Sequence, residues 1–359
     1  TVKQSGGKMR GIIEINLKIL GNNLKYFKSR VGGEVKIACV VKANAYGHGL
    51  REVVKATENL ADYYVVATVE EGLEVRGVTA TPTLLLCPLS IEETAVCIEN
   101  KLEMSIGSID DAERIISVSE NMRTGAYVHF CVDTGMNRMG FKDEKSLYKS
   151  INRVKNCRTV TIKGVYSHFF DGKNEAITRG QFNTFRRFTK GFNKTVIRHI
   201  SATDGFSYEK YRLDMCRIGI GLYGYELGEV EPCLAVRSYV ARVAKVKKGE
   251  NVGYGGRFKA EKDEIIATIT MGYGDGLPRS FTGGFILIGG KKRKVVGNIC
   301  MDYCFAIVDR SVKAGDEAVL IGRQGTEVQT AEEIAEKCGT ISYEILTGLK
   351  RFERLYTDD

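Results

Sequence analysis

The sequence predicts an α/β protein, in which a TIM-like (β/α)₈ barrel over residues 1–229 is followed by a mostly antiparallel β domain over residues 230–359. Two observations carry this prediction. Short apolar runs alternate with amphipathic stretches over the first two-thirds of the chain, and roughly eight such units fit a barrel. After residues 228–232 the pattern changes to β-rich runs separated by glycine turns. The opening apolar run, residues 11–17, precedes any predicted helix and could join either domain.

The predicted strands of the barrel are apolar runs that are too short for helices and that end in turn-forming residues. They fall at residues 35–41, 63–67, 83–87, 126–132, 160–167 and 196–201. Helices are predicted between them at residues 50–59, 69–76, 91–100, 110–120 and 181–192. In the second domain, strands are predicted at residues 239–246, 265–271, 285–288, 295–299, 305–308 and 318–321. One helix, capped by Thr330, is predicted at residues 331–337.

Composition limits the classes of function. The 359 residues exceed one core of modal size, so two domains are expected. The formal charge is 53 − 44 = +9, but the basic residues are scattered and no nucleic-acid-binding motif accompanies them. No run approaches the roughly 20 apolar residues of a membrane span, and no N-terminal apolar segment suggests a secretory signal. We therefore expect neither nucleic acid nor membrane as a partner of this segment.

The ten cysteines form no CxxC pair, and no histidine-rich metal-binding spacing accompanies them. Several lie inside apolar runs, such as Cys39, Cys87 and Cys131. They are expected to be free, buried thiols, which persist in a reducing compartment. This predicts a cytoplasmic protein without a metal site. The chain begins at Thr1, which leaves room for an upstream segment.

Lys42 follows the apolar, β-branched run of residues 35–41, which predicts a buried strand. An amine at the end of such a strand is desolvated, and desolvation lowers the pKa of a lysine. A low-pKa amine can form a Schiff base and can later accept a proton. The residues that follow offer backbone N–H groups, the Tyr46 hydroxyl and the His48 imidazole, which suit a phosphate. The pattern indicates pyridoxal 5'-phosphate held on Lys42.

Further polar residues stand where other predicted strands end. Asp133 opens a segment that ends in Arg138, and His168, Ser201 and Arg217 each follow an apolar run. Taken singly, each has an ordinary structural interpretation, such as a buried histidine or a helix-capping serine. In a barrel, however, the carboxyl ends of the strands meet at the face that carries the active site. We therefore expect these side chains to line one pocket with Lys42.

The motifs of the chain resemble the alanine racemase family over roughly residues 10–350. The matching strings are VVKANAYGHG, CVDTGMNRMG, YSHF, ISATDG, CRIGIGLYG, VGYGG, MGYGDG, NICMD and TISYEILT, in the family's order. The resemblance implies a pyridoxal-phosphate barrel with a C-terminal β domain, assembled as a head-to-tail homodimer. It also implies interconversion of L- and D-alanine, which supplies D-alanine for peptidoglycan in the cell wall.

The resemblance implies three roles in proton transfer. Lys42 would carry the cofactor and serve as one base, and Tyr254 would be the second base, reaching the active site of the partner subunit. Racemisation needs a base on each face of a planar carbanion. Arg217 would face the pyridine nitrogen, and because arginine gives up its proton very reluctantly, that nitrogen would stay largely unprotonated. This arrangement favours racemisation over transamination.

The remaining roles implied by the resemblance concern binding. Phosphate contacts are implied for Tyr46, Ser201, Tyr343 and the backbone N–H groups of Gly219 and Ile220. His168 would pack against the cofactor ring. Arg138 would bond the cofactor phenolate and help to hold the substrate carboxylate. Tyr273, Met301 and Asp302 match residues at the substrate entrance, with Met301 acting across the dimer interface.

One residue departs from the family's pattern. The family commonly has a carbamylated lysine two residues before the position of Asp133, and its negative charge orients the arginine. This chain has Cys131 there, and a thiol cannot form the same stable carbamate. Arg138 would then lack its usual anionic partner. We expect a small anion such as chloride to take that place.

Three alternatives stay open at this point. One is a serine or mixed serine/alanine racemase domain of a vancomycin-resistance membrane protein; Tyr343 counts against it, because serine-active relatives tend to have a smaller polar residue there. A barrel-type decarboxylase of basic amino acids would need an acidic partner at the ring nitrogen, where this chain has Arg217. A pyridoxal-phosphate carrier would consist of the barrel alone and would lack an equivalent of Tyr254.

Overall fold

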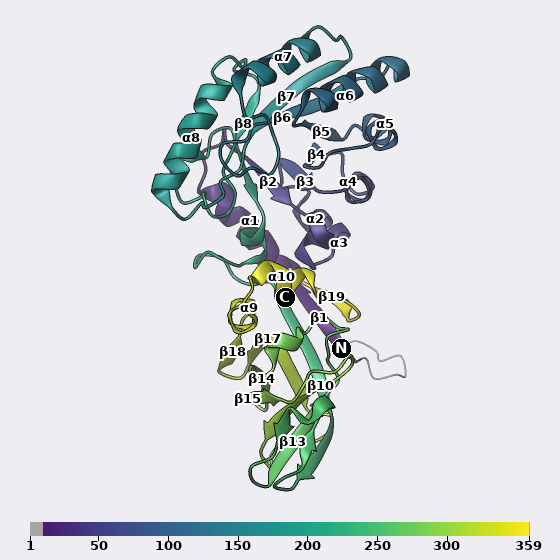
Figure 1. Cartoon of the computed structure of the whole chain (residues 1–359), viewed down its shortest axis with the longest axis vertical. Helices are drawn as coiled ribbons and strands as arrows, with labels where there is room; N and C mark the ends of the chain where they lie inside the picture. Colours follow the sequence, from purple (N-terminus) through teal and green to yellow (C-terminus); the bar gives the residue numbers. More distant parts are fainter. Residues whose placement is uncertain (1–9, 359) are drawn as a thin grey trace. The chain divides into compact units, whose positions relative to one another are not determined.

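The computed structural model describes residues 10–358, which divide into two compact units (Figure 1). The barrel unit comprises Ile19–Ala45 and Leu50–Glu231. The sheet unit comprises the residues up to Lys18, Tyr46–Gly49 and the residues from Pro232 onward. The main boundary between Glu231 and Pro232 lies close to the predicted boundary at residue 229.

The barrel unit is built on eight parallel strands in the order β8-β7-β6-β5-β4-β3-β2-β9. These strands are β2 (Lys36–Val40), β3 (Tyr63–Val66), β4 (Thr83–Leu85), β5 (Glu103–Ile106), β6 (Ala126–Cys131), β7 (Val160–Tyr166), β8 (Ile197–His199) and β9 (Met215–Ile218). Most are buried on both faces, which explains their nearly continuous apolar sequences. A parallel bridge between Ala202 and Arg217 joins the segment after β8 to β9 and nearly closes the barrel. The predicted barrel is confirmed.

Helices lie outside these strands (Figure 1). They are α1 (Leu17–Ser29), α3 (Leu50–Thr57), α4 (Val69–Arg76), α5 (Ile91–Glu99), α6 (Ile109–Met122), α7 (Glu144–Lys155) and α8 (Glu175–Thr189). Thr68 opens α4 and Ser90 opens α5, each in a capping box. The predictions omitted α1, α7 and β5. The start of α8 was placed too late, at residue 181, because the cap supplied by Asn174 was not recognised.

The sheet unit carries nine of its strands in one sheet, in the order β18-β17-β14-β15-β16-β13-β10-β1-β19, among the described residues. They are β1 (Gly11–Asn16), β10 (Leu234–Val246), β13 (Glu264–Ile269), β14 (Phe285–Ile288), β15 (Lys291–Val296), β16 (Cys304–Val308), β17 (Glu317–Gln324), β18 (Glu327–Gln329) and β19 (Glu353–Thr357). Strands β11 (Asn251–Val252) and β12 (Phe258–Lys259) form a separate hairpin. Helices α9 (Ala331–Cys338) and α10 (Ser342–Thr347) complete the unit. Every pairing within the large sheet is antiparallel except that between β1 and β19, which confirms the mostly antiparallel second domain.

The first strand resolves a choice that the sequence left open. Strand β1 pairs antiparallel with β10, with Ile13 opposite Val236, and parallel with β19, with Ile13 opposite Arg354. The range 1–229 proposed for the barrel therefore needs correction at its start, because β1 belongs to the large sheet. Its alternating buried and half-buried residues fit a strand with one face toward the core.

The segment Tyr46–Gly49 belongs to the sheet unit although the barrel precedes and follows it. The Nε of Arg354 donates to the carbonyl oxygen of Gly47 at 2.8 Å. A Cβ at Gly47 would lie 2.3 Å from the carbonyl oxygen of Leu346, so this close approach requires glycine. None of the helices in residues 10–358 is both long enough and apolar enough to span a membrane.

Candidate active site

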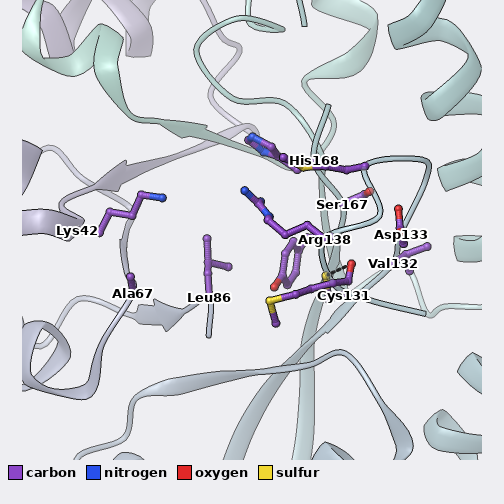
Figure 2. Close-up of a pocket in the computed structure, with 12 residues that line it drawn as sticks. Lys42, Ala67, Leu86, Cys131, Val132, Asp133, Arg138, Ser167 and His168 are labelled. Carbon is purple, nitrogen blue, oxygen red and sulfur yellow. Dashed lines mark hydrogen bonds between the residues drawn. The ribbon is translucent and has the colours of Figure 1, made fainter. Parts of the chain in front are cut away.

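The carboxyl ends of the barrel strands surround a cavity of about 220 Å³. Its lining includes Lys42, Cys131, Asp133, Arg138, Tyr166 and His168. Three of the predicted site residues, Lys42, Arg138 and His168, therefore meet around one space. In Figure 2 the amine of Lys42 and the guanidinium of Arg138 both point into it. The cavity lies where active sites of barrel enzymes form.

Lys42 stands just past the end of β2 and is partly buried. Burial lowers the pKa of its amine, and the positive charge of Arg138 lowers that pKa further, while Glu71 opposes the shift. Both main causes disfavour the ammonium form. A larger share of Lys42 is therefore unprotonated than of a lysine in water, as a nucleophile or a base requires.

The backbone after Lys42 makes a left-handed turn, α2 (Lys42–Tyr46). The φ angles of Ala43, Asn44, Ala45 and Tyr46 all lie at 52–53°. This region costs a residue with a side chain roughly 1–2 kcal/mol, so the turn must be held by its surroundings. The Ala43 N–H donates to Oε1 of Glu71 at 2.6 Å, and the Leu50 N–H donates to Oδ1 of Asn44 at 2.9 Å. The strained turn thus fixes the backbone directly beside Lys42.

Arg217 lies on β9 with only 3% of its surface exposed. Its Nη1 donates to Nδ1 of His199 at 2.7 Å, and its Nη2 donates to the carbonyl oxygen of Ser167 at 2.7 Å. Nη2 also lies 3.2 Å from Nδ1 of His168. Burial lowers the pKa of Arg217 to about 10, which still leaves the guanidinium charged at neutral pH. The structure therefore holds a fixed cation close to His168.

His168 follows β7 and lines the cavity. Burial lowers the pKa of its imidazole to about 3, with further lowering from the charges of Arg217, Arg138 and Lys42. The ring is therefore neutral at the pH of the cell. Because the Arg217 guanidinium can only donate, Nδ1 of His168 is the acceptor in their contact.

Arg138 is carried by a loop that Asp133 shapes. Oδ1 of Asp133 accepts hydrogen bonds from the N–H groups of Gly135 at 2.8 Å and Asn137 at 3.1 Å. The thiol of Cys131 donates to the carbonyl oxygen of Met139 at 3.6 Å, and burial raises its pKa to about 11. Cys131 is therefore a neutral neighbour, and no carboxylate of the described residues forms an ion pair with Arg138.

The predicted phosphate contacts differ in where the structure places them. Ser201 is fully buried, and its hydroxyl donates to the carbonyl oxygen of Ala202 at 3.3 Å. The hydroxyl oxygen of Thr203 accepts instead from the N–H groups of Gly219 at 3.3 Å and Gly221 at 3.2 Å. Thr203 was missed by the sequence argument and is the hydroxyl that meets these amides. The adjacent Ile220 begins the 3₁₀ helix η2 (Ile220–Tyr223), where N–H groups lack helical partners.

The remaining predicted site residues lie in the sheet unit. The rings of Tyr46 and Tyr343 are neighbours, with centroids 5.8 Å apart. The loops that carry Tyr273 and Met301 are joined, because the Tyr273 N–H donates to the carbonyl oxygen of Cys300 at 3.0 Å. Tyr254 is 74% exposed. These residues belong to connections between strands, which is where variable and functional residues concentrate.

Asp302 is already engaged by two arginines. Nη1 of Arg351 lies 3.0 Å from Oδ1 of Asp302, and Nη2 of Arg10 lies 3.8 Å from the same oxygen. Both arginines also form ion pairs with the buried Asp275, at 3.0 and 3.2 Å. The C-terminal Arg351, for which the sequence offered no interpretation, therefore anchors the loop of Asp302.

The residues present fit pyridoxal phosphate. The amine of Lys42 is desolvated and faces a cavity, as attachment of an aldehyde requires. The hydroxyl of Thr203, which accepts from the N–H groups of Gly219 and Gly221, can still donate its own proton to a phosphate. No group of three or more histidine, cysteine, aspartate or glutamate side chains suited to a metal ion is found in residues 10–358.

The barrel, the second domain and this site define a pyridoxal-phosphate-dependent racemase, an isomerase. The chain belongs to the alanine racemase family. The family model for the alanine racemase N-terminal domain matches residues 15–227, and that for the C-terminal domain matches residues 233–356. The range 15–227 covers the barrel unit except for its last four residues, 228–231.

Individual relatives agree with the family match. An alanine racemase of Methanococcus maripaludis is 34% identical, over 96% of this chain and 97% of the relative. The crystal structure of alanine racemase from Bacillus anthracis with bound L-Ala-P has a TM-score of 0.92 and is 29% identical, covering 98% of this chain and 96% of that one. The alanine racemase structure of Clostridium difficile 630 has a TM-score of 0.91 at 33% identity, covering 98% and 96%.

These matches bear on the three alternative functions that the sequence left open. They support the alanine interpretation and not the serine racemase alternative. The match to the C-terminal domain excludes a carrier that consists of the barrel alone. The decarboxylase alternative needed an acidic partner at the ring nitrogen, whereas the described contacts of Arg217 are histidines and backbone carbonyl oxygens.

Proposed function

We propose that this protein interconverts L- and D-alanine by two-base proton transfer and so supplies D-alanine for peptidoglycan. One observation carries the proposal: the Lys42 amine, with its lowered pKa, faces the cavity that Arg138 and His168 line. Bound pyridoxal phosphate would withdraw electrons from the amino acid and acidify its Cα–H bond. The side chains of the chain then have to bind the substrate and move the proton.

Two bases on opposite faces complete the transfer. Lys42 removes or returns the proton on one face, which its lowered pKa favours. Tyr254 serves the other face. Arg138 holds the substrate carboxylate, as a guanidinium suits a carboxylate. Arg217, which remains a cation, would donate toward the ring nitrogen without protonating it, and this would favour return of the proton to the amino acid.

The other binding roles are part of the same proposal. Tyr46, Ser201, Tyr343 and the amides of Gly219 and Ile220 hold the phosphate, and the hydroxyl of Thr203 joins them. Thr203 is added to the residues proposed from the sequence, because its oxygen meets the amides of Gly219 and Gly221. His168 packs against the ring as a neutral imidazole. Tyr273, Met301 and Asp302 shape the substrate entrance, Asp302 through its ion pair with Arg351.

We propose that the active enzyme is a homodimer in which Tyr254 and Met301 serve the site of the partner subunit. Large apolar side chains are exposed on the sheet unit: Tyr254 at 74%, Met301 at 53% and Tyr273 at 42%. Exposed aromatic and methionine side chains are typical of interface residues. We also place the protein in the cytoplasm, because all ten cysteines are free thiols.

Borohydride reduction of the yellow holoenzyme followed by peptide mapping tests the cofactor attachment. A reduced pyridoxyl adduct is expected on Lys42 and should be absent in Lys42→Ala. Turnover of L-alanine and L-serine is then compared under the same conditions. Serine turnover equal to or above that of alanine would contradict the proposed substrate, and a protein that stays colourless after incubation with pyridoxal phosphate would contradict the proposed function itself.

A further inference from the structure

A continuous chain of hydrogen bonds runs through the barrel interior from Glu103 to Arg217. Oε2 of Glu103, at the start of β5, lies 2.7 Å from Nε2 of His129 on β6. Nδ1 of His129 lies 2.9 Å from Nε2 of His199 at the end of β8. Nδ1 of His199 lies 2.7 Å from Nη1 of Arg217. None of the four residues is more than 4% exposed.

The charge of Arg217 determines which nitrogen of each histidine in this hydrogen-bonded series carries the proton. A guanidinium can only donate, so Nδ1 of His199 must accept and its proton must lie on Nε2. That proton points at Nδ1 of His129, which must therefore be unprotonated. The proton of His129 then lies on Nε2 and points at the carboxylate of Glu103. Both imidazoles are fixed as neutral Nε2–H tautomers, and burial together with the charge of Arg217 lowers the pKa of His199 well below its usual value.

The packing around this chain leaves the rings little freedom. A Cβ at Gly164 on β7 would lie 2.2 Å from Nδ1 of His129, so this glycine makes room for the ring. Tyr166 stacks on His199 with ring centroids 5.2 Å apart. Tyr63 contacts His129 edge-on, with ring centroids 6.2 Å apart. The rings therefore stay in the orientation that the hydrogen bonds need.

This series of hydrogen bonds also links the positive charge of Arg217 to a buried carboxylate. A buried cation is costly unless it is paired. No carboxylate of the described residues forms an ion pair with Arg217; its hydrogen-bond partners are imidazole nitrogens and carbonyl oxygens. Glu103 is the buried carboxylate that reaches Arg217 through hydrogen bonds, and aligned hydrogen bonds polarise one another in a medium of low dielectric constant.

We propose that Glu103, through His129 and His199, is a positioning residue that orients Arg217 and supports its positive charge at the active site. The hydrogen-bonded chain stands on the structure alone, whereas its effect on catalysis rests on the proposed function. Glu103 does not touch the reacting atoms. It acts by making His199 a stronger acceptor, which holds the guanidinium in one place and in one charge state.

The tautomers are measured first, by ¹⁵N NMR of the holoenzyme labelled at histidine. The sequence has only four histidines, His48, His129, His168 and His199, so single substitutions assign the signals. The expected result is a neutral Nε2–H tautomer for both His129 and His199. A cationic ring or an Nδ1–H tautomer at either position would overturn the proposal, whatever the enzymatic activity is.

The effect of the hydrogen-bonded series on catalysis is measured with Glu103→Gln, which keeps an acceptor oxygen and removes the charge. Its matched control is Glu113→Gln on the outer helix α6, where the glutamate pairs with Arg153. In Glu103→Gln, kcat should fall roughly tenfold, as when an outer partner of an active-site ligand is lost, with KM changed less than kcat. The cofactor absorbance band and the ¹⁵N signals of His199 should shift, and the borohydride adduct on Lys42 should remain. The control should leave all of these unchanged.

A double-mutant cycle separates this role from a merely structural one. The effects of Glu103→Gln and His199→Asn on kcat should be strongly non-additive, because either change breaks the same chain, whereas Glu113→Gln and His199→Asn should be additive. If Glu103→Gln has wild-type kcat, absorbance and His199 signals, the proposal fails. If the wild-type protein forms no adduct at Lys42, the proposed function fails while the tautomer result still decides the hydrogen-bonded chain.

Discussion

The carboxylate of Glu71 accepts a hydrogen bond from the backbone N–H of Ala43 at 2.6 Å. Its second oxygen accepts from the N–H groups of Ala67 at 2.9 Å and Thr68 at 3.3 Å, at the start of α4. One side chain thus closes the capping box of a helix and holds the left-handed turn beside Lys42. Two strained or unsatisfied stretches of backbone depend on the same carboxylate.

Replacing Glu71 should therefore cost more stability than replacing an ordinary helix residue. Glu71→Ala removes the carboxylate that accepts hydrogen bonds from three N–H groups. We therefore expect the free energy of unfolding to fall by about 2–3 kcal/mol. Urea unfolding of the apoprotein measures it. Glu74→Ala, an exposed position on the same helix, should change it by less than about 0.5 kcal/mol. Equal losses in both variants would show that the turn does not depend on Glu71.

Tyr254→Phe should abolish most racemisation without releasing the cofactor. The substitution removes one hydroxyl from an exposed side chain, so folding should be unaffected. Loss of a proton-transfer group should lower kcat by roughly 10²–10⁴-fold. Activity assays and borohydride mapping on the same preparation check both parts. Tyr26→Phe on the outer helix α1 serves as the control and should keep full activity; a fully active Tyr254→Phe would remove the second base from the mechanism.

The neutral thiol of Cys131 predicts that activity depends on a small anion. Arg138 has no anionic partner among the described residues, so chloride beside it should order the guanidinium for the substrate carboxylate. At constant ionic strength, KM for L-alanine should be roughly three- to tenfold lower in chloride than in gluconate. Cys131→Asp supplies a fixed negative charge and should lose this dependence, whereas the neutral Cys131→Ser should keep it. Equal KM values in both salts for the wild-type protein would refute an anion at Arg138.

The low pKa of His168 predicts a loss of stability in mild acid. Its pKa is about 3 when folded, against 6.5 for the ordinary side chain, so the unfolded chain binds a proton that the folded chain does not. The stabilisation is complete above pH 6.5 and is lost as the pH falls from there toward 3, by about 1.4 kcal/mol per pH unit. His168→Asn should reduce the slope of unfolding free energy against pH by about this amount. Urea unfolding of the apoproteins between pH 5 and 7 measures both slopes.

The sequence predicted the parts of this protein that depend on local patterns. The strand before Lys42 and the turn after it were recognised because an apolar run gives way to a glycine-containing segment within a few residues. The alternation of strands and helices likewise predicted the barrel, although α7 was missed. Its amphipathic stretch, with Leu147 and Ile151 buried, lies in a segment whose many polar and charged residues hide the helical period.

Other features could not be predicted because they depend on which strands lie side by side. The contact of Thr203 with the amides of Gly219 and Gly221 was not predicted, because Ser201 and Thr203 follow the same strand and only the fold shows which hydroxyl meets these amides. Glu103 was overlooked for a related reason. A charged residue at the head of a four-residue strand resembles a loop residue, and its partner His129 becomes visible only when β5 pairs with β6.

The pairing of β1 with both β10 and β19 has a consequence for how the protein is made. Residues 11–16 leave the ribosome long before the neighbours of this strand, residues 234–246 and 353–357. The large sheet therefore cannot close until residue 357 has emerged, and until then the strand before the first helix of the barrel lacks one of its neighbours. Truncations that remove the last ten residues should thus be harmful out of proportion to their length, because they strip one side of the earliest strand.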